Sequence, residues 1–289
     1  MRLKFRKIHP VFGAEADPVD LRTLQDDELA ALRAAMDEHA VLVFRDQRLS
    51  GDEQLAFSQR FDGELHTQTS LSVLARNRLG SEALSDVANV NENGEIMAAD
   101  DRRRMGSVSN RLWHTDASFV DPAGRYSLLL AKVVPPVRAD TEFADMRAAH
   151  DALDEETRER IAGLHCFHSI IYSRQVMGFE FSPAEQARLP GAVHPLVRTL
   201  PGGRKSLYLA SHASHVIEWP LPEGRLLLRD LTEHATQPRF VYRHEWRLND
   251  MVIWDNRSTM HRARPFDDKT HRRELRRTTT LDLPLPQAA

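Results

Sequence analysis

The sequence contains very little cysteine and no long apolar segment. Its single cysteine, Cys166, excludes a disulfide within the chain and any zinc or iron–sulfur site built from several cysteines. Such low cysteine usage fits a reducing compartment. No stretch approaches the roughly 20 apolar residues of a membrane-spanning helix, and the basic N-terminus lacks the apolar core of a signal peptide. We therefore expect a cytoplasmic protein without a membrane segment.

An excess of positive charge is also missing. The chain has 39 Lys and Arg residues against 42 Asp and Glu residues, for a net charge of -3. A general binder of nucleic acids or anionic membranes needs a basic excess, so neither is an expected partner. The glycine-rich loops GxGxxG after a strand and GxxxxGK[ST] are absent as well. Rossmann and P-loop nucleotide chemistry are therefore set aside.

The 289 residues are expected to form one domain, spanning 1–289, that is mainly β with helices (α+β). Many strand-like segments occur without regular βαβ alternation, which indicates a barrel or sandwich with helices packed outside. Helices are predicted at about 26–38, from residue 50, and at about 146–164 and 223–235. Strands are predicted at 40–44, 127–134, 165–172, 206–210, 251–254 and 278–283.

Residues 66–111 form a long polar segment that differs from the rest of the chain. Long irregular segments within a compact domain are often functional lids, and we predict such a lid over an active site here. The segment contains the charge run 100–104, which we interpret as a solvent-exposed loop.

The string Trp113-His114-Thr115-Asp116 offers two metal ligands at close spacing. On an extended strand, residues i and i+2 project to the same face, so His114 and Asp116 could reach one ion. An HxD pair alone is weak evidence, because it also occurs by chance on surface strands.

A second histidine strengthens the metal interpretation. His261 follows an apolar strand, 251–254, and could point back into the mouth of a barrel. Two histidines and one carboxylate are the ligand set of non-haem Fe(II) oxygenases, which leave coordination positions open for a bidentate 2-oxo acid and O₂. The alternatives are a closed structural zinc site and a zinc hydrolase.

Four arginines lie just beyond His261, in the string 271–277. On a strand, Arg273 and Arg277 share a face. Two inward arginines are costly unless each meets an anion, and guanidinium binds carboxylate in a bidentate manner. This pair suggests two carboxylates, one from a co-substrate and one from a substrate. A basic, solvent-exposed edge strand is the alternative.

Together these strings resemble the Fe(II)/2-oxoglutarate-dependent dioxygenases of the TauD/TfdA family. The resemblance covers nearly the whole chain, and it lies closest to the herbicide-degrading aryloxyacetate branch. The strings that carry this closer likeness are 212–216, 233–237 and 273–277. It implies a double-stranded β-helix (jelly roll), Fe(II), and 2-oxoglutarate and O₂ as co-substrates. It also implies a homo-oligomer.

The same resemblance implies roles for individual residues. His114, Asp116 and His261 would hold iron. Thr141 and Arg273 would bind the distal carboxylate of 2-oxoglutarate, with Asn110 nearby, although a one-residue length difference leaves Arg272 as an alternative anchor. The residues expected at the substrate are Arg277, for its acidic group, and His212 and His215.

The predicted reaction is hydroxylation of the carbon next to the ether oxygen of an aryloxyacetate such as 2,4-dichlorophenoxyacetate. The products would be a phenol, glyoxylate, succinate and CO₂. The alternative is a family sibling that acts on taurine, another sulfonate or a different small organic acid.

Overall fold

The computed structural model describes residues 3–67 and 78–283. Its centre is a large sheet with the strand order β1-β2-β3-β13-β5-β15-β4, in which only β2 and β3 pair in parallel. These strands are β1 (Phe5–Lys7), β2 (Ala14–Ala16), β3 (Val41–Phe44), β4 (Ser85–Ala88), β5 (Gly124–Val133), β13 (Met251–Asp255) and β15 (Glu274–Leu281).

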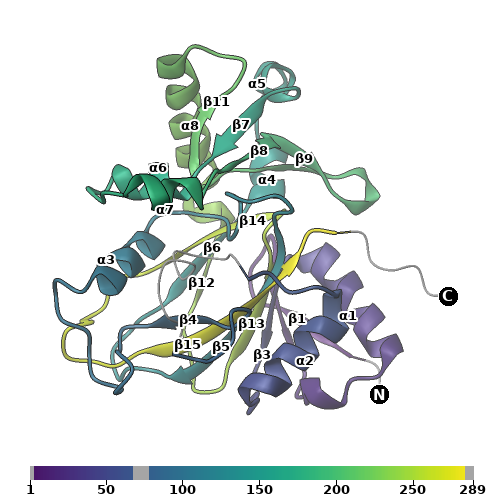
Figure 1. Ribbon diagram of the computed structural model, residues 1–289. Helices are drawn as coiled ribbons and strands as arrows, with labels where there is room; N and C mark the ends of the chain where they lie inside the picture. Colours follow the sequence, from purple (N-terminus) through teal and green to yellow (C-terminus); the bar gives the residue numbers. More distant parts are fainter. Residues whose placement is uncertain (1–2, 68–77, 284–289) are drawn as a thin grey trace.

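Three smaller sheets complete the β-structure. The first has the order β12-β6-β14 and packs against the large sheet; its strands are β12 (Val241–His244), β6 (Thr141–Asp145) and β14 (Thr259–Ala263). The other two lie in the upper part of the molecule in Figure 1. They consist of β11 (Ala213–Val216), β7 (His165–His168) and β8 (Ala192–Pro195), and of β10 (Lys205–Leu207) and β9 (Val197–Thr199). The facing antiparallel sheets form the predicted jelly-roll core.

Strand β3 shows how the apolar run at 41–44 builds this core. All four of its side chains are buried, because the strand has neighbours on both faces. Val41 and Val43 join a cluster between the sheets that includes Phe143 of β6. Leu42 and Phe44 join a second cluster on the outer face. The alternation follows from the two-residue period of a strand.

Helices pack on the outer face of the large sheet and on the outer face of the β12-β6-β14 sheet (Figure 1). The first two, α1 (Asp26–His39) and α2 (Gly51–Asp62), pack on the large sheet, and Ser50 begins α2 with the predicted capping box to Glu53. The remaining helices are α3 (Arg102–Val108), α4 (Met146–Asp151), α5 (Glu155–Ile161), α6 (Ile170–Gln175), α7 (Pro183–Ala187) and α8 (Leu221–Ala235). Within the described ranges, no helix is long and apolar enough to cross a membrane.

Several predicted bounds differ from those observed: the strand predicted at 206–210 is β10, which ends at Leu207, and the strand predicted at 278–283 is part of β15, which begins at Glu274. Two further differences have a clear cause. The helix predicted at 146–164 is two helices, because Asp154 caps a new start by accepting a hydrogen bond from the Thr157 N–H at 2.8 Å. The strand predicted at 165–172 ends at His168, where Ser169 caps α6 through the Tyr172 N–H at 3.2 Å. In both cases a side-chain cap overrides the apolar pattern.

The segment predicted to be a lid is partly built into the fold. Its β4 pairs with β15 at the edge of the large sheet, and its α3 leads towards His114. Residues 68–77 of this segment lie outside the described residues.

Candidate active site

Three buried side chains meet at one end of the jelly roll. His114 and Asp116 come from the loop before β5, and His261 comes from β14. One donor atom from each lies within 4.8 Å of the others. The Asp116 carboxylate is 3.8 Å from the Nε2 of His114 and 3.7 Å from the Nε2 of His261. The fold thus brings together two residues that are separated by one position in the sequence and a third that is far away.

The backbone fixes the two histidines against each other. The His114 N–H donates to the His261 carbonyl at 3.0 Å, and the His261 N–H donates to the His114 carbonyl at 2.9 Å. This isolated bridge replaces the continuous strand that we expected for the HxD string. Asp116 instead lies in the turn that follows, where Ala117 adopts a positive φ of 52°. The two side chains still converge, because the turn directs Asp116 back to the bridge.

Asn256 organises the surroundings of the carboxylate. Its Oδ1 accepts hydrogen bonds from the Asp116 N–H at 3.1 Å and from Trp254 Nε1 at 3.0 Å. Its Nδ2 donates to Ser127 Oγ at 2.9 Å, and Ser127 in turn donates to Asp116 Oδ2 at 2.8 Å. Sequence reasoning did not assign Asn256 a role. Its place directly after a buried strand, in the string Trp254-Asp255-Asn256, was the available signal.

The chemistry of the donors suits a divalent metal ion. Burial lowers the pKa of His114 and His261, so both imidazoles are neutral near pH 7. The Nδ1 of His114 lies 2.8 Å from the Leu112 carbonyl, which favours the tautomer that leaves Nε2 free to bind a metal. Burial is the largest single influence and opposes ionisation of Asp116, but Arg277, the two histidines and the Ser127 hydroxyl together outweigh it, so the pKa of Asp116 is lowered. Two neutral imidazoles and one carboxylate form the ligand set of a non-haem iron site.

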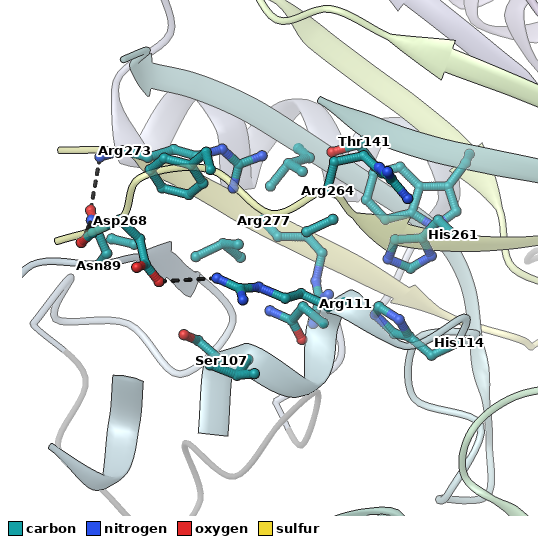
Figure 2. Close-up of a pocket in the computed structure, with 18 residues that line it drawn as sticks. Asn89, Ser107, Arg111, His114, Thr141, His261, Arg264, Asp268, Arg273 and Arg277 are labelled. Carbon is teal, nitrogen blue, oxygen red and sulfur yellow. Dashed lines mark hydrogen bonds and ion pairs between the residues drawn. The ribbon is translucent and has the colours of Figure 1, made fainter. Parts of the chain in front are cut away.

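A pocket opens beside the two histidines and is lined by cationic side chains (Figure 2). Thr141 of β6, Asn110 and Arg273 all contribute to its wall, as predicted for one binding site. The Oγ1 of Thr141 accepts a hydrogen bond from Trp246 Nε1 at 2.9 Å, which fixes the threonine side chain.

Arg273 and Arg272 occupy different environments. Arg273 is buried in the pocket, its guanidinium makes no ion pair within the described chain, and burial lowers its pKa to about 10. Its backbone N–H donates to Asn89 Oδ1 at 2.8 Å. Arg272 is half-exposed and forms an ion pair with Glu274 at 2.7 Å. Only Arg273 of the two alternatives lines the pocket.

Arg277 lies on β15, four residues beyond Arg273, and also lines the pocket. It is buried, and its Nη1 pairs with the Oδ1 of Asp116. The predicted shared face of the two arginines is therefore observed, but one of them already contacts a carboxylate of the protein.

The two candidate substrate histidines separate in the structure. His212 is buried with its ring 6.2 Å from the ring of His114, and its Nδ1 lies 3.2 Å from Ser118 Oγ. His215, on β11, packs against Phe167 with the ring centres 5.7 Å apart. Neither residue lines the pocket of Figure 2, and only His212 lies beside the metal-ligand candidates.

The mouth of the pocket contains charged residues that sequence reasoning missed. Asp268, in the loop between β14 and β15, pairs with Arg104 at 2.9 Å and with Arg111 at 3.2 Å. Figure 2 shows Arg111 extended between Asp268 and the histidines. Arg104 belongs to the charge run that we interpreted as a solvent-exposed loop. Its side chain is only 12% exposed, because it pairs with Asp268.

Comparisons with known proteins place this geometry in context. The sequence model of the family described as "Taurine catabolism dioxygenase TauD, TfdA family" matches residues 4–279. The chain is 46% identical over 278 residues to the alpha-ketoglutarate-dependent 2,4-dichlorophenoxyacetate dioxygenase of Cupriavidus pinatubonensis, covering 95% of this chain and 96% of the relative. It is 44% identical over 284 residues to the enzyme of the same name from Burkholderia sp. strain RASC, covering 97% and 95%.

A solved structure is similar over nearly the whole chain. The crystal structure of AAD-2 in complex with Mn(II) and N-oxalylglycine has a TM-score of 0.93 and 44% sequence identity, and 99% of each chain is covered.

Proposed function

Because this chain belongs to the TauD/TfdA family of dioxygenases, we propose that it is an Fe(II)- and 2-oxoglutarate-dependent dioxygenase of aryloxyacetates. The carbon next to the ether oxygen is hydroxylated, and the resulting hemiacetal breaks down to a phenol and glyoxylate. Succinate and CO₂ arise from 2-oxoglutarate. One observation carries the proposal: a His-Asp-His cluster borders a pocket containing a buried arginine that has no ion-pair partner among the described residues. The relatives named above favour an aryloxyacetate over taurine.

In this proposal His114, Asp116 and His261 hold the iron. When bound, iron supplies the O₂ activation that no amino-acid side chain can provide. The protein's own part is to position the ligands. Asn256 and Ser127 orient the Asp116 carboxylate, and the backbone bridge keeps the two imidazoles together.

Thr141, Arg273 and Asn110 bind 2-oxoglutarate. A bidentate contact between the Arg273 guanidinium and the distal carboxylate gives that buried cation a counter-ion, and the Thr141 hydroxyl offers a second contact. Arg272 is not needed in this role, because its side chain pairs with Glu274 outside the pocket.

Arg277, His212 and His215 are proposed to contact the substrate, with different support for each. The Arg277 guanidinium forms an ion pair with Asp116 and adds positive charge to the site. The ring of His212 lies beside that of His114. His215 has the least support, since its ring packs on Phe167.

We also propose that the chain acts as a single domain in which part of 66–111 shields the site from water. The support is that Asn110 and Arg111 line the pocket and that Asp268 ties Arg111 to the loop before β15. Assembly into a homo-oligomer and a cytoplasmic location belong to the same proposal.

Release of 2,4-dichlorophenol from 2,4-dichlorophenoxyacetate tests this function. The assay contains the purified protein, Fe(II), 2-oxoglutarate and O₂, with omission of each as a control. Phenol formation that requires all of them supports the proposal. Sulfite release from taurine without phenol release would move the chain to the sulfonate-oxidising alternative.

A further inference from the structure

The pairing of β4 with β15 ends beside the arginine that we assign to 2-oxoglutarate. Ala88 pairs with Glu274, so the next pair in this antiparallel ladder is Asn89 with Arg273. A pair at this position normally exchanges two backbone hydrogen bonds. One of them is formed, from the Asn89 N–H to the Arg273 carbonyl at 3.2 Å. The Asn89 carbonyl instead accepts from the Met97 N–H at 3.0 Å, because the chain turns here into the hairpin 89–97.

The side chain of Asn89 takes the place of this backbone acceptor. Its Oδ1 accepts a hydrogen bond from the Arg273 N–H at 2.8 Å, the contact that Figure 2 draws between the two residues. Both backbone polar groups of Arg273 are therefore bonded to Asn89, which is itself buried and lines the same pocket. These bonds fix the backbone from which the Arg273 side chain enters the pocket.

The amide nitrogen of Asn89 holds the loop that precedes Arg273. Its Nδ2 donates to the Asp268 carbonyl at 2.8 Å and to the His271 carbonyl at 2.9 Å. The three side-chain contacts use one acceptor and two donors, and an amide supplies both. An ionised carboxylate of the same shape supplies the acceptor alone. The residue type at position 89 therefore matches the contacts that it makes.

Arg273 depends on such support more than an ion-paired arginine would. Its guanidinium is buried and has no ion-pair partner among the described residues, so no protein carboxylate fixes its direction. Arg277 differs in this respect, because its Nη1 is bound to Asp116. A bidentate contact with a carboxylate requires the guanidinium to be held in one orientation. For Arg273 the fixed backbone contributes this orientation.

We infer that Asn89 is a positioning residue for 2-oxoglutarate, acting through the backbone of Arg273 and of the loop 268–273. Its effect is specific to the distal carboxylate of the co-substrate, because that carboxylate is the group that Arg273 binds. This inference rests on the proposed function, which identifies 2-oxoglutarate as the acid in this pocket.

The test compares 2-oxoglutarate with 2-oxopentanoate, which has the same chain length and a methyl group in place of the distal carboxylate. Isothermal titration calorimetry measures the Kd of each acid for the Mn(II)-loaded protein, in the wild type and in Asn89→Ala, so that no turnover is needed. We expect Asn89→Ala to raise the Kd for 2-oxoglutarate about tenfold, since three buried backbone groups lose their partner. The Kd for 2-oxopentanoate should change less than about threefold, because this acid makes no contact with Arg273.

Asn89→Asp separates positioning from the filling of space. Aspartate has nearly the same size and keeps an acceptor for the Arg273 N–H, but it loses both donors and adds a negative charge to the pocket wall. We expect the Kd for 2-oxoglutarate to rise about 30-fold or more, beyond the effect of Asn89→Ala, because the added charge also repels the distal carboxylate. If position 89 only filled space, this substitution would leave the Kd unchanged.

Asn91→Ala is the matched control. Asn91 lies in the same hairpin, and its Oδ1 accepts from the backbone N–H groups of Asn93 and Glu95 at 3.0 Å each. It does not line the pocket. The substitution therefore loosens the hairpin without removing a contact to Arg273, and both Kd values should stay at the wild-type level. Thermal unfolding identifies any variant that has lost its fold; if Asn89→Ala does, Asn89→Asp decides alone.

Two results would overturn the inference. One is a wild-type Kd for 2-oxoglutarate in the folded Asn89 variants. The other is an equal rise in the Kd for both acids, which would show that Asn89 supports the site in general and not the Arg273 contact. If the wild type binds 2-oxoglutarate no more tightly than 2-oxopentanoate, the proposed function is contradicted instead.

Discussion

At the scale of single residues, the site depends on how each charge is compensated. Arg273 and Arg277 are four residues apart and both buried, yet among the described residues only Arg277 forms an ion pair with a protein carboxylate. Sequence spacing could predict their common face, because a strand has a period of two. It could not predict the pairing of Arg277 with Asp116, because that contact joins positions 161 residues apart.

The same substitution at these two arginines should have opposite effects on stability. Arg273→Met removes an unpaired buried charge and should raise the free energy of unfolding of the metal-free protein by about 1 kcal/mol. Arg277→Met leaves Asp116 without its partner and should lower it by about 3 kcal/mol. Denaturant titration of the metal-free proteins measures both. Destabilisation by Arg273→Met would mean that its guanidinium has a partner in the free protein.

Asn256 should control metal affinity without touching the metal. Asn256→Ala removes the hydrogen bonds to the Asp116 backbone and to Ser127, and should weaken Fe(II) binding about 10- to 100-fold. Anaerobic titration with Fe(II) provides the measurement, and Asn93→Ala on an exposed turn is the control. Wild-type affinity in Asn256→Ala would show that the carboxylate is held without it.

At the scale of elements, apolar patterns and helix caps explain which helices and strands were predicted correctly from the sequence and which were not. The run 41–44 and the capping box at Ser50 predict β3 and α2 because their signals are local. The helix predicted at 146–164 is broken by the cap at Asp154, which competes with a continuous apolar pattern. Strand order and the isolated bridge of His114 with His261 are non-local, so no sequence period could reveal them.

Helix α3 should be held over the pocket mainly by one carboxylate. Asp268 pairs with Arg104 of α3 and with Arg111 just after it. Asp268→Asn removes both ion pairs and should increase amide hydrogen exchange across 102–111 about tenfold, because partly buried pairs oppose local opening. Hydrogen exchange by mass spectrometry provides the measurement, with α1 as the internal reference. Equal exchange in both proteins would show that other contacts hold α3.

At the scale of the whole molecule, stability should depend on a histidine far from the metal ligands in sequence. His168 is fully buried between His194 and Tyr208, and neither ring nitrogen has a hydrogen-bond partner within 3–67 and 78–283. Burial lowers its pKa well below 6.5 in the folded state. As the pH falls, the His168 imidazole of the unfolded chain is protonated near pH 6.5, before that of the folded protein. The contribution of neutral His168 to the free energy of unfolding is therefore fully present above pH 6.5 and is lost as the pH drops below it.

This dependence gives a prediction for the folded protein as a whole. Between pH 6.5 and 5, the free energy of unfolding should fall by up to about 1.4 kcal/mol per pH unit on account of His168. His168→Phe keeps an aromatic ring and should reduce the slope by that amount. Urea titrations at several pH values measure it. The same slope in wild type and variant would mean that His168 does not bind the proton on unfolding.

The central claim is that the His-Asp-His cluster and its arginine pocket bind iron and 2-oxoglutarate beside an aryloxyacetate. The most direct measurement is the anaerobic visible absorption of the Fe(II)-loaded protein, first with 2-oxoglutarate and then with 2,4-dichlorophenoxyacetate. We predict a weak charge-transfer band on addition of 2-oxoglutarate and a shift of this band on addition of the aryloxyacetate. Absence of any band from protein shown to contain Fe(II) would contradict the claim.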